Sequence, residues 1–275
     1  MSSKSLYTIT LKGVSQVMLQ ENIYTGLLFF IAIFYVNQIA SLYMLLATFL
    51  ATYFAFKISL DENSLNSGIY GFNAALVGVA VELFFGVSFF SITLLIFGSV
   101  LTVLIQEYFR KNSFSLFTLP FILVVWLFLW LFSSFVTLEN SLNTDENLEL
   151  FSMVFKGFSE VFFQDSIITG ILFFIAIYIS NKKASFFALF FSILASIIAY
   201  LLDFDLYSIN MGLFAYNTVL CAIVFANFEK NSYIFALFST IFALIIQIIF
   251  IKLSFIALTF PFVLASIVLL KFYKN

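Results

Sequence analysis

The segment SQVMLQENIYTG, residues 15–26, runs directly into the apolar stretch LLFFIAIFY, residues 27–35. Residues 159–170 read SEVFFQDSIITG and are followed by ILFFIAIYI. With an offset of 144, residues 13–35 are identical to residues 157–179 at 13 of 23 positions. Matching among abundant Phe and Ile residues would not easily supply the shared Gly, Ser, Gln and Thr. The sequence therefore predicts an internal duplication.

The composition is that of a chain surrounded by lipid. The 275 residues are 63% hydrophobic and 9% charged, with a net charge of −2 and a mean hydropathy of +1.14, whereas a soluble domain carries about 25% charged residues. The long, continuous apolar stretches favour membrane helices, which need about 20 residues each, over a barrel. We predict an all-α, polytopic membrane protein. The single cysteine, Cys221, excludes an intrachain disulfide, and the N-terminal MSSKSLYTITLKG does not resemble a cleavable signal.

Two further motifs repeat in the same order in both halves. GIYGFNAAL, starting at Gly68, matches GLFAYNTVL, starting at Gly212, and TLPF at Thr118 matches TFPF at Thr259. Between the halves lies TLENSLNTDENLEL, with four acidic residues and no basic one. We predict a first repeat over residues 1–136, an acidic linker over 137–150 and a second repeat over 151–275.

Each half is expected to contain a short helix, two spans, a short apolar segment and two further spans ending in the Thr-x-Pro-Phe element. The short segment, residues 68–80 in the first half, is too brief to cross about 30 Å of hydrocarbon and is expected to be re-entrant or broken. An odd number of crossings per half would invert the second repeat. Lysines at both ends of the chain (Lys4, Lys12, Lys271 and Lys274) favour cytoplasmic termini. Inverted repeats with discontinuous helices predict a central pore between them.

Polar residues recur at equivalent places beside the apolar stretches. Gln16 matches Glu160, and Gln20 and Gln164 follow one helical turn later on the same face. They would either cap short helices in contact with head groups or face a pore, and we favour the pore for the matched pairs because polar groups within a membrane usually face a cavity.

The other repeated motifs add apolar walls and hydroxyl groups. Phe72 and Leu76 lie four residues apart, as do Tyr216 and Leu220, so each pair shares a helix face that would line the pore or simply pack. The hydroxyls of Thr118 and Thr259 would cap a helix or meet a solute. For Asn73 and Asn217, which follow the aromatic residue in each copy, helix-end capping is the favoured role.

Several functions lack the residues that they require. The chain has no histidine, so it has no imidazole base or histidine proton relay. It has no phosphate-binding Gly-rich loop with a lysine and no arginine ladder. Neither a nucleophile–base pair nor a metal or cofactor motif is present, so we do not expect an enzyme. The remaining groups suit a small, uncharged, polar solute that moves down its gradient.

Together, QVMLQENIYTG with EVFFQDSIITG, GIYGFNAALVG with GLFAYNTVL, and TLPF with TFPF resemble the bacterial urea transporters. The resemblance covers nearly the whole chain outside the linker and termini. It implies a homotrimer in the bacterial inner membrane, with ten spans in two inverted halves of five and one channel-like pore per protomer. The solute would be urea, in a selectivity filter with flat apolar walls and ladders of oxygen atoms.

The resemblance also assigns the pore-lining residues. On the cytoplasmic side these are Gln16, Val17, Leu19, Phe72 and Leu76, on the outer side Glu160, Val161, Phe163, Tyr216 and Leu220, and at the central constriction Thr118 and Thr259. The sequence departs from the family where Asn-Ile and Ser-Ile replace Asn-Pro, at residues 22–23 and 166–167. It also departs at Leu19 and Tyr216, where Phe is expected. These departures leave a short amide, ammonia or water as alternative solutes.

Overall fold

The computed structural model describes residues 5–111, 116–137 and 147–274, without the side chain of Lys274. All regular secondary structure in these ranges is helical. The chain forms two compact units, residues 1–140 and 141–275. Most of the predicted acidic linker, residues 138–146, lies outside the described residues, as does Lys4.

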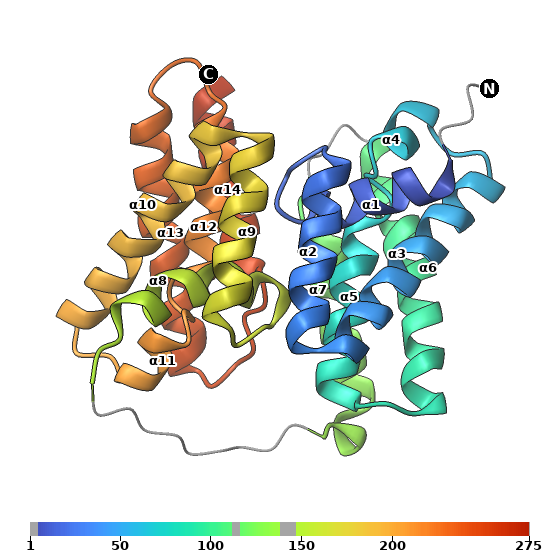
Figure 1. Ribbon diagram of the computed structural model, residues 1–275, viewed down its shortest axis with the longest axis horizontal. Helices are drawn as coiled ribbons and strands as arrows, with labels where there is room; N and C mark the ends of the chain where they lie inside the picture. Colours follow the sequence, from blue (N-terminus) through green and yellow to red (C-terminus); the bar gives the residue numbers. More distant parts are fainter. Residues whose placement is uncertain (1–4, 112–115, 138–146, 275) are drawn as a thin grey trace. The chain divides into compact units, whose positions relative to one another are not determined.

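Unit 1 contains seven α-helices and one 3-10 turn within its described ranges (Figure 1). They are α1 (Leu6–Gln16), α2 (Ile23–Val36), α3 (Gln38–Lys57), α4 (Glu62–Asn66), α5 (Phe72–Phe85), α6 (Phe89–Lys111), α7 (Leu119–Leu131) and η1 (Ser133–Phe135). The 14 residues of α5 rise about 21 Å at 1.5 Å per residue, less than the thickness of the hydrocarbon layer.

Unit 2 repeats the same order of α-helices, but its 3-10 turn follows the first helix instead of the last. They are α8 (Leu150–Ser159), η2 (Glu160–Phe162), α9 (Ile167–Ser180), α10 (Lys182–Leu201), α11 (Leu206–Asn210), α12 (Tyr216–Ala226), α13 (Ser232–Lys252) and α14 (Phe260–Lys274). Both units thus place a short helix, a pair of longer helices, one short turn of helix, a mid-length helix, a long helix and a final helix in series.

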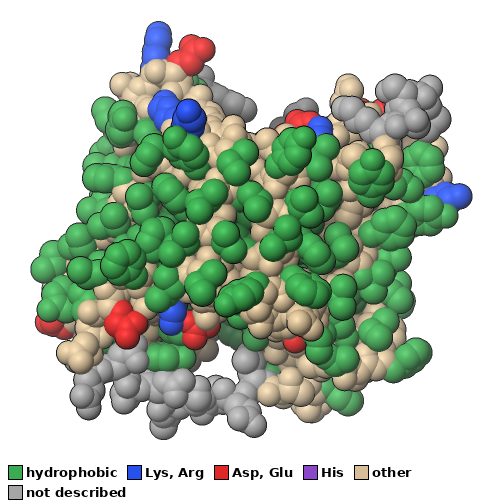
Figure 2. Space-filling view, viewed as in Figure 1, with side chains coloured by type: hydrophobic (Ala, Val, Ile, Leu, Met, Phe, Trp, Pro, Cys, Tyr) green, Lys and Arg blue, Asp and Glu red, His purple; other side chains and the backbone are tan. Residues whose placement is uncertain are grey.

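Among the described residues, four helices are long and apolar enough to cross a membrane, namely α3, α6, α10 and α13. The continuous segment of α8 and η2 is followed by α9 at a bend of 76°. Taken together as one broken span, they make a fifth candidate. In Figure 2, hydrophobic side chains cover the middle of the visible face of each unit, and most charged side chains lie toward its upper and lower margins.

One expected boundary is wrong. The Thr-x-Pro-Phe elements do not end two further spans but begin the last helix of each unit, since Leu119 opens α7 and Phe260 opens α14. The physical reason is that proline is well tolerated in the first turn of a helix, where its missing N–H has no partner within the helix.

Side-chain caps fix where the helices begin. Asn22 accepts hydrogen bonds from the backbone N–H groups of Tyr24 and Thr25, at 2.9 and 3.2 Å, at the start of α2. Ser166 accepts one from Thr169 N–H, at 3.2 Å, at the start of α9. The Asn-Ile and Ser-Ile departures therefore keep the cap and lose only the preorganised proline at the first helical position.

The repeated glycines set the close approach of the first two helices in each unit. A Cβ atom at Gly26 would lie 1.9 Å from the carbonyl oxygen of Leu11, and one at Gly170 would lie 1.9 Å from that of Phe155. No side chain fits at these distances. The Thr-Gly element thus lets α1 cross α2, and α8 cross α9, at backbone contact.

Candidate functional site

In unit 1 the duplicated segment ends α1 in a left-handed turn. Leu19 has a φ angle of 59°, and the Gln20 N–H donates a hydrogen bond of 3.1 Å to the carbonyl oxygen of Ser15. This six-residue closure is typical of a Schellman-type helix end. The buried Gln20 side chain donates through Nε2 to the carbonyl oxygen of Met18 at 2.9 Å. Gln20 therefore satisfies the backbone of the bend.

The same turn follows η2 in unit 2. Phe163 has a φ angle of 56°, and the Gln164 N–H donates to the carbonyl oxygen of Ser159 at 3.1 Å. The Gln164 side chain donates to the carbonyl oxygen of Phe162 at 2.8 Å. The matched glutamines thus have a local structural role, which explains why both copies keep them.

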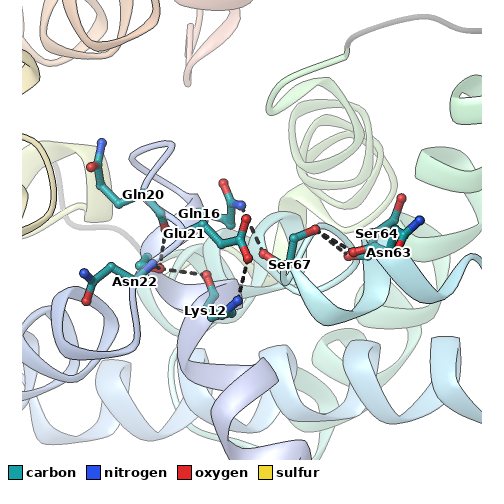
Figure 3. A network of polar contacts seen from close by, with 9 residues as sticks. Lys12, Gln16, Gln20, Glu21, Asn22, Asn63, Ser64 and Ser67 are labelled. Atoms are coloured by element: carbon teal, nitrogen blue, oxygen red, sulfur yellow. Dashed lines mark hydrogen bonds and ion pairs between the residues drawn. The ribbon is translucent and has the colours of Figure 1, made fainter. Parts of the chain in front are cut away.

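Gln16 connects the end of α1 to the end of α4. Its Nε2 donates a 3.0 Å hydrogen bond to the carbonyl oxygen of Ser67, the C-cap residue of α4. Close by, Lys12 Nζ and Glu21 Oε1 form an ion pair of 2.5 Å across the bend (Figure 3). Gln16 is half-buried, so part of its side chain remains accessible.

Glu160 occupies the equivalent position in unit 2 and has different chemistry. It begins η2 and is half-buried, beside a second ion pair of 2.5 Å between Lys156 and Asp165. The carboxyl group of Glu160 has no N–H, so it cannot make the N–H contact that Gln16 makes, and its oxygens can accept hydrogen bonds. Glu160 therefore offers acceptors to any N–H group that approaches the bend.

The apolar residues that are predicted to line the pore lie on the mid-length helices α5 and α12. Phe72 and Leu76 are buried in the first turns of α5, and Tyr216 and Leu220 are buried at the same places in α12. The two members of each pair are four residues apart and so share one face. Helix α5 contacts α1 and α7 among other helices of unit 1, and α12 contacts η2 and α14 among other elements of unit 2.

Asn73 holds the start of α7 in unit 1. Its Oδ1 accepts a 3.1 Å hydrogen bond from the Phe121 N–H, and its Nδ2 donates to the carbonyl oxygen of Phe117 at 3.3 Å. Phe117 has a left-handed φ angle of 49° and directly precedes Thr118, the N-cap residue of α7. The expectation of helix-end capping is confirmed, although the capped helix is α7 and not α5.

Asn217 makes the same contacts at the start of α14 in unit 2. Its Oδ1 accepts from the Phe262 N–H at 3.1 Å, and its Nδ2 lies 3.3 Å from the carbonyl oxygen of Leu258. The Tyr216 hydroxyl donates to that same carbonyl oxygen at 2.7 Å. The hydroxyl by which Tyr216 differs from Phe72 thus binds the backbone just before Thr259.

Sequence reasoning missed two glutamines behind these asparagines. Gln106 Oε1 accepts from Asn73 Nδ2 at 3.4 Å, and Gln247 Oε1 accepts from Asn217 Nδ2 at 3.1 Å. The two glutamines are separated by 141 residues, as are Thr118 and Thr259. That shared offset is a sequence signal that could have found them.

The predicted lining residues fall into two sets of six with matching environments. In unit 1, Val17, Phe72, Leu76 and Thr118 are buried, whereas Gln16 and Leu19 are half-buried. In unit 2, Val161, Tyr216, Leu220 and Thr259 are buried, whereas Glu160 and Phe163 are half-buried. Within each unit, the six residues lie at the bend after the first helix, on one face of the mid-length helix, and at the threonine that precedes the last helix. Their assignment to a pore is still a prediction.

Residues 7–274 match the family described as urea transporter (UT). The chain belongs to the urea transporter family. As a member it is a multi-pass helical membrane protein, and a transporter family agrees with the expectation that the chain is not an enzyme.

Several mammalian family members show the same relationship. The chain is 28% identical to urea transporter 1 of Rattus norvegicus and 26% identical to that of Mus musculus, each over an alignment of 237 residues that covers 78% of this chain. Urea transporter 1 of Ovis aries is 25% identical over the same share. The chain spans 61% of the length of each of these relatives.

Proposed function

We propose that this protein carries urea across the cell membrane by channel-like, facilitated diffusion through a narrow slot. The observation that carries the proposal is a site built twice: an amide or carboxylate at a helix bend, an aromatic and a leucine in the adjacent wall, and a threonine at an asparagine-held helix start. Membership of the urea transporter family supports the same solute.

The chemistry of these groups suits urea. Urea is planar and neutral, with four N–H donors and one carbonyl acceptor. Its N–H groups would move from the oxygen of Gln16 or Glu160 to the threonine oxygens while its flat faces slide along the apolar walls. These oxygens replace hydrogen bonds to water, whose loss would cost roughly 2–7 kcal/mol per unpaired polar group. Selection would then rest on slot width and hydrogen-bond geometry, not on charge.

The proposal includes an arrangement of the two units. Repeated element order and the family resemblance support two inverted repeats of five spans each around a central pore, with discontinuous helices at its ends. One set of six residues would line the cytoplasmic half and the other the outer half, with Thr118 and Thr259 at the constriction. The assembly would be a homotrimer in the bacterial inner membrane, with both termini cytoplasmic.

Stopped-flow light scattering on proteoliposomes tests the function. Vesicles that contain the protein are expected to take up urea faster than empty vesicles, without added ions or ATP. Equal rates would refute the proposal. Competition by acetamide and parallel water-permeability measurements would show whether a short amide or water is the better substrate.

Two substitutions test the lining residues. Glu160→Leu and Thr259→Val remove an acceptor and a hydroxyl at nearly constant volume, and each is expected to abolish most urea flux while the oligomer stays folded. Leu104→Ala, on the exposed face of α6, is the control and should conduct normally. Normal flux through both site variants would show that the proposed lining is wrong even if the protein conducts urea.

A further inference from the structure

Unit 1 has an apolar groove where α1, α2 and α3 meet. The groove has a volume of about 650 Å³, and its lining includes Leu11, Phe30, Leu42 and Leu46. This volume lies within the range of about 300–1,000 Å³ that is typical of small-molecule sites. The Thr10 hydroxyl in its wall already donates to the carbonyl oxygen of Leu6 at 2.8 Å. The lining therefore offers almost nothing for a polar solute to bind.

Unit 2 carries aromatic rings at the equivalent positions. At the offset of 144, Leu11 becomes Phe155 and Leu42 becomes Phe186. The ring of Phe174 lies 6.4 Å from that of Phe155 and 6.1 Å from that of Phe186, both edge to face. These three rings join α8, α9 and α10, whereas the leucines at the same places in unit 1 leave an opening.

The environment of the groove indicates what fills it. Helix α3 is a candidate membrane span, and Leu42, Leu46 and Phe49 follow one another along its groove side over about 10 Å. A site with so few polar groups does not hold ordered water, and an empty one loses the dispersion contacts of its lining. Leu42 and Leu46 are 53% and 43% exposed, so the groove is open to the surrounding hydrocarbon.

We propose that this groove binds one acyl chain of a membrane lipid, in place of the phenylalanine rings that occupy the equivalent position in unit 2. The chemistry that is recognised is a flexible, unbranched hydrocarbon. This site is separate from the residues assigned to urea, so it stands or falls independently of the transport function.

Native mass spectrometry of the protein purified in mild detergent tests the proposal. The wild-type protomer is expected to retain a bound lipid, and Leu11→Phe/Leu42→Phe, which copies the residues of unit 2, is expected to lose most of it. Urea flux and oligomeric state should not change. Leu104→Phe, on an exposed position of α6, is the matched control and should keep the lipid.

A second measurement needs no variant and covers the case in which the double substitution misfolds. A phosphatidylcholine with a diazirine in its acyl chain is expected to label peptides of α1 and α3 in the wild-type protein. Absence of labelling there would overturn the proposal. So would a double variant that keeps its lipid but changes its oligomeric state, because the groove would then seat a second copy of the chain.

Discussion

The substitution Asn217→Leu isolates the contact that holds the start of α14. Leucine has nearly the shape of asparagine, so the change removes hydrogen-bonding groups without opening a large cavity. The amide oxygen that accepts from the Phe262 N–H at 3.1 Å is lost, in a position where the side chain is 1% exposed. The carbonyl oxygen of Leu258 keeps the Tyr216 hydroxyl at 2.7 Å. Gln247 Oε1, which is buried, also loses the 3.1 Å bond from Asn217 Nδ2. The cost is therefore that of one buried donor and one buried acceptor that lose a partner, about 1–3 kcal/mol for each.

The assay is thermal unfolding in detergent, combined with urea flux in proteoliposomes. A loss of this size is expected to lower Tm by about 2–4 °C for each kcal/mol. Because Asn217 positions the helix start that carries Thr259, flux should fall in the protein that remains folded. Asn63→Leu, at an exposed position of α4, is the control and should leave both unchanged. A variant that unfolds at the wild-type temperature and conducts normally would refute the reasoning.

Three further changes probe other parts of the fold. Gly26→Ala forces a methyl group into the backbone of the crossing helix, 1.9 Å from a carbonyl oxygen, and should greatly reduce the yield of folded protein on size-exclusion chromatography; a normal elution profile would contradict the close packing. Tyr216→Phe removes the hydroxyl bound to Leu258 and should lower stability by about 0.5–1.5 kcal/mol with urea flux largely kept, as measured by thermal unfolding and stopped flow. The hydrogen bond from the Ser64 N–H at the start of α4 lowers the pKa of Asp61 below its usual value. The stabilisation is therefore present above the ordinary pKa and is lost as pH falls through the lowered pKa. Asp61→Asn should remove this dependence of Tm on acid pH, and an unchanged Tm–pH profile would disprove the contribution.

The composition and the internal repeat determined the class of this protein because both are properties of the residue order and do not depend on tertiary contacts. A chain with so few charged residues can cover its surface only in lipid. Its apolar stretches are long and continuous, as membrane helices require. The offset of 144 also pairs Gly26 with Gly170 and Gln20 with Gln164. The backbone contacts of these glycines and the bend contacts of these glutamines give the physical reasons for their repetition.

Other features depend on which helices meet, and the sequence does not state that. Asn73 lies in the first turn of α5 but caps α7, 48 residues later, and its second partner, Gln106, lies on α6. The left-handed turns at Leu19 and Phe163 carry no glycine to announce them. A local sequence pattern reflects the preferences of neighbouring residues. The partner of a buried polar group is set instead by tertiary packing, which brings a donor and an acceptor from distant parts of the chain to about 3 Å from each other. The sequence alone therefore determined a duplicated membrane protein with polar residues at matching positions. Only the tertiary structure showed that Gln20 and Gln164 support the backbone of a bend, because their partners depend on how the chain turns there.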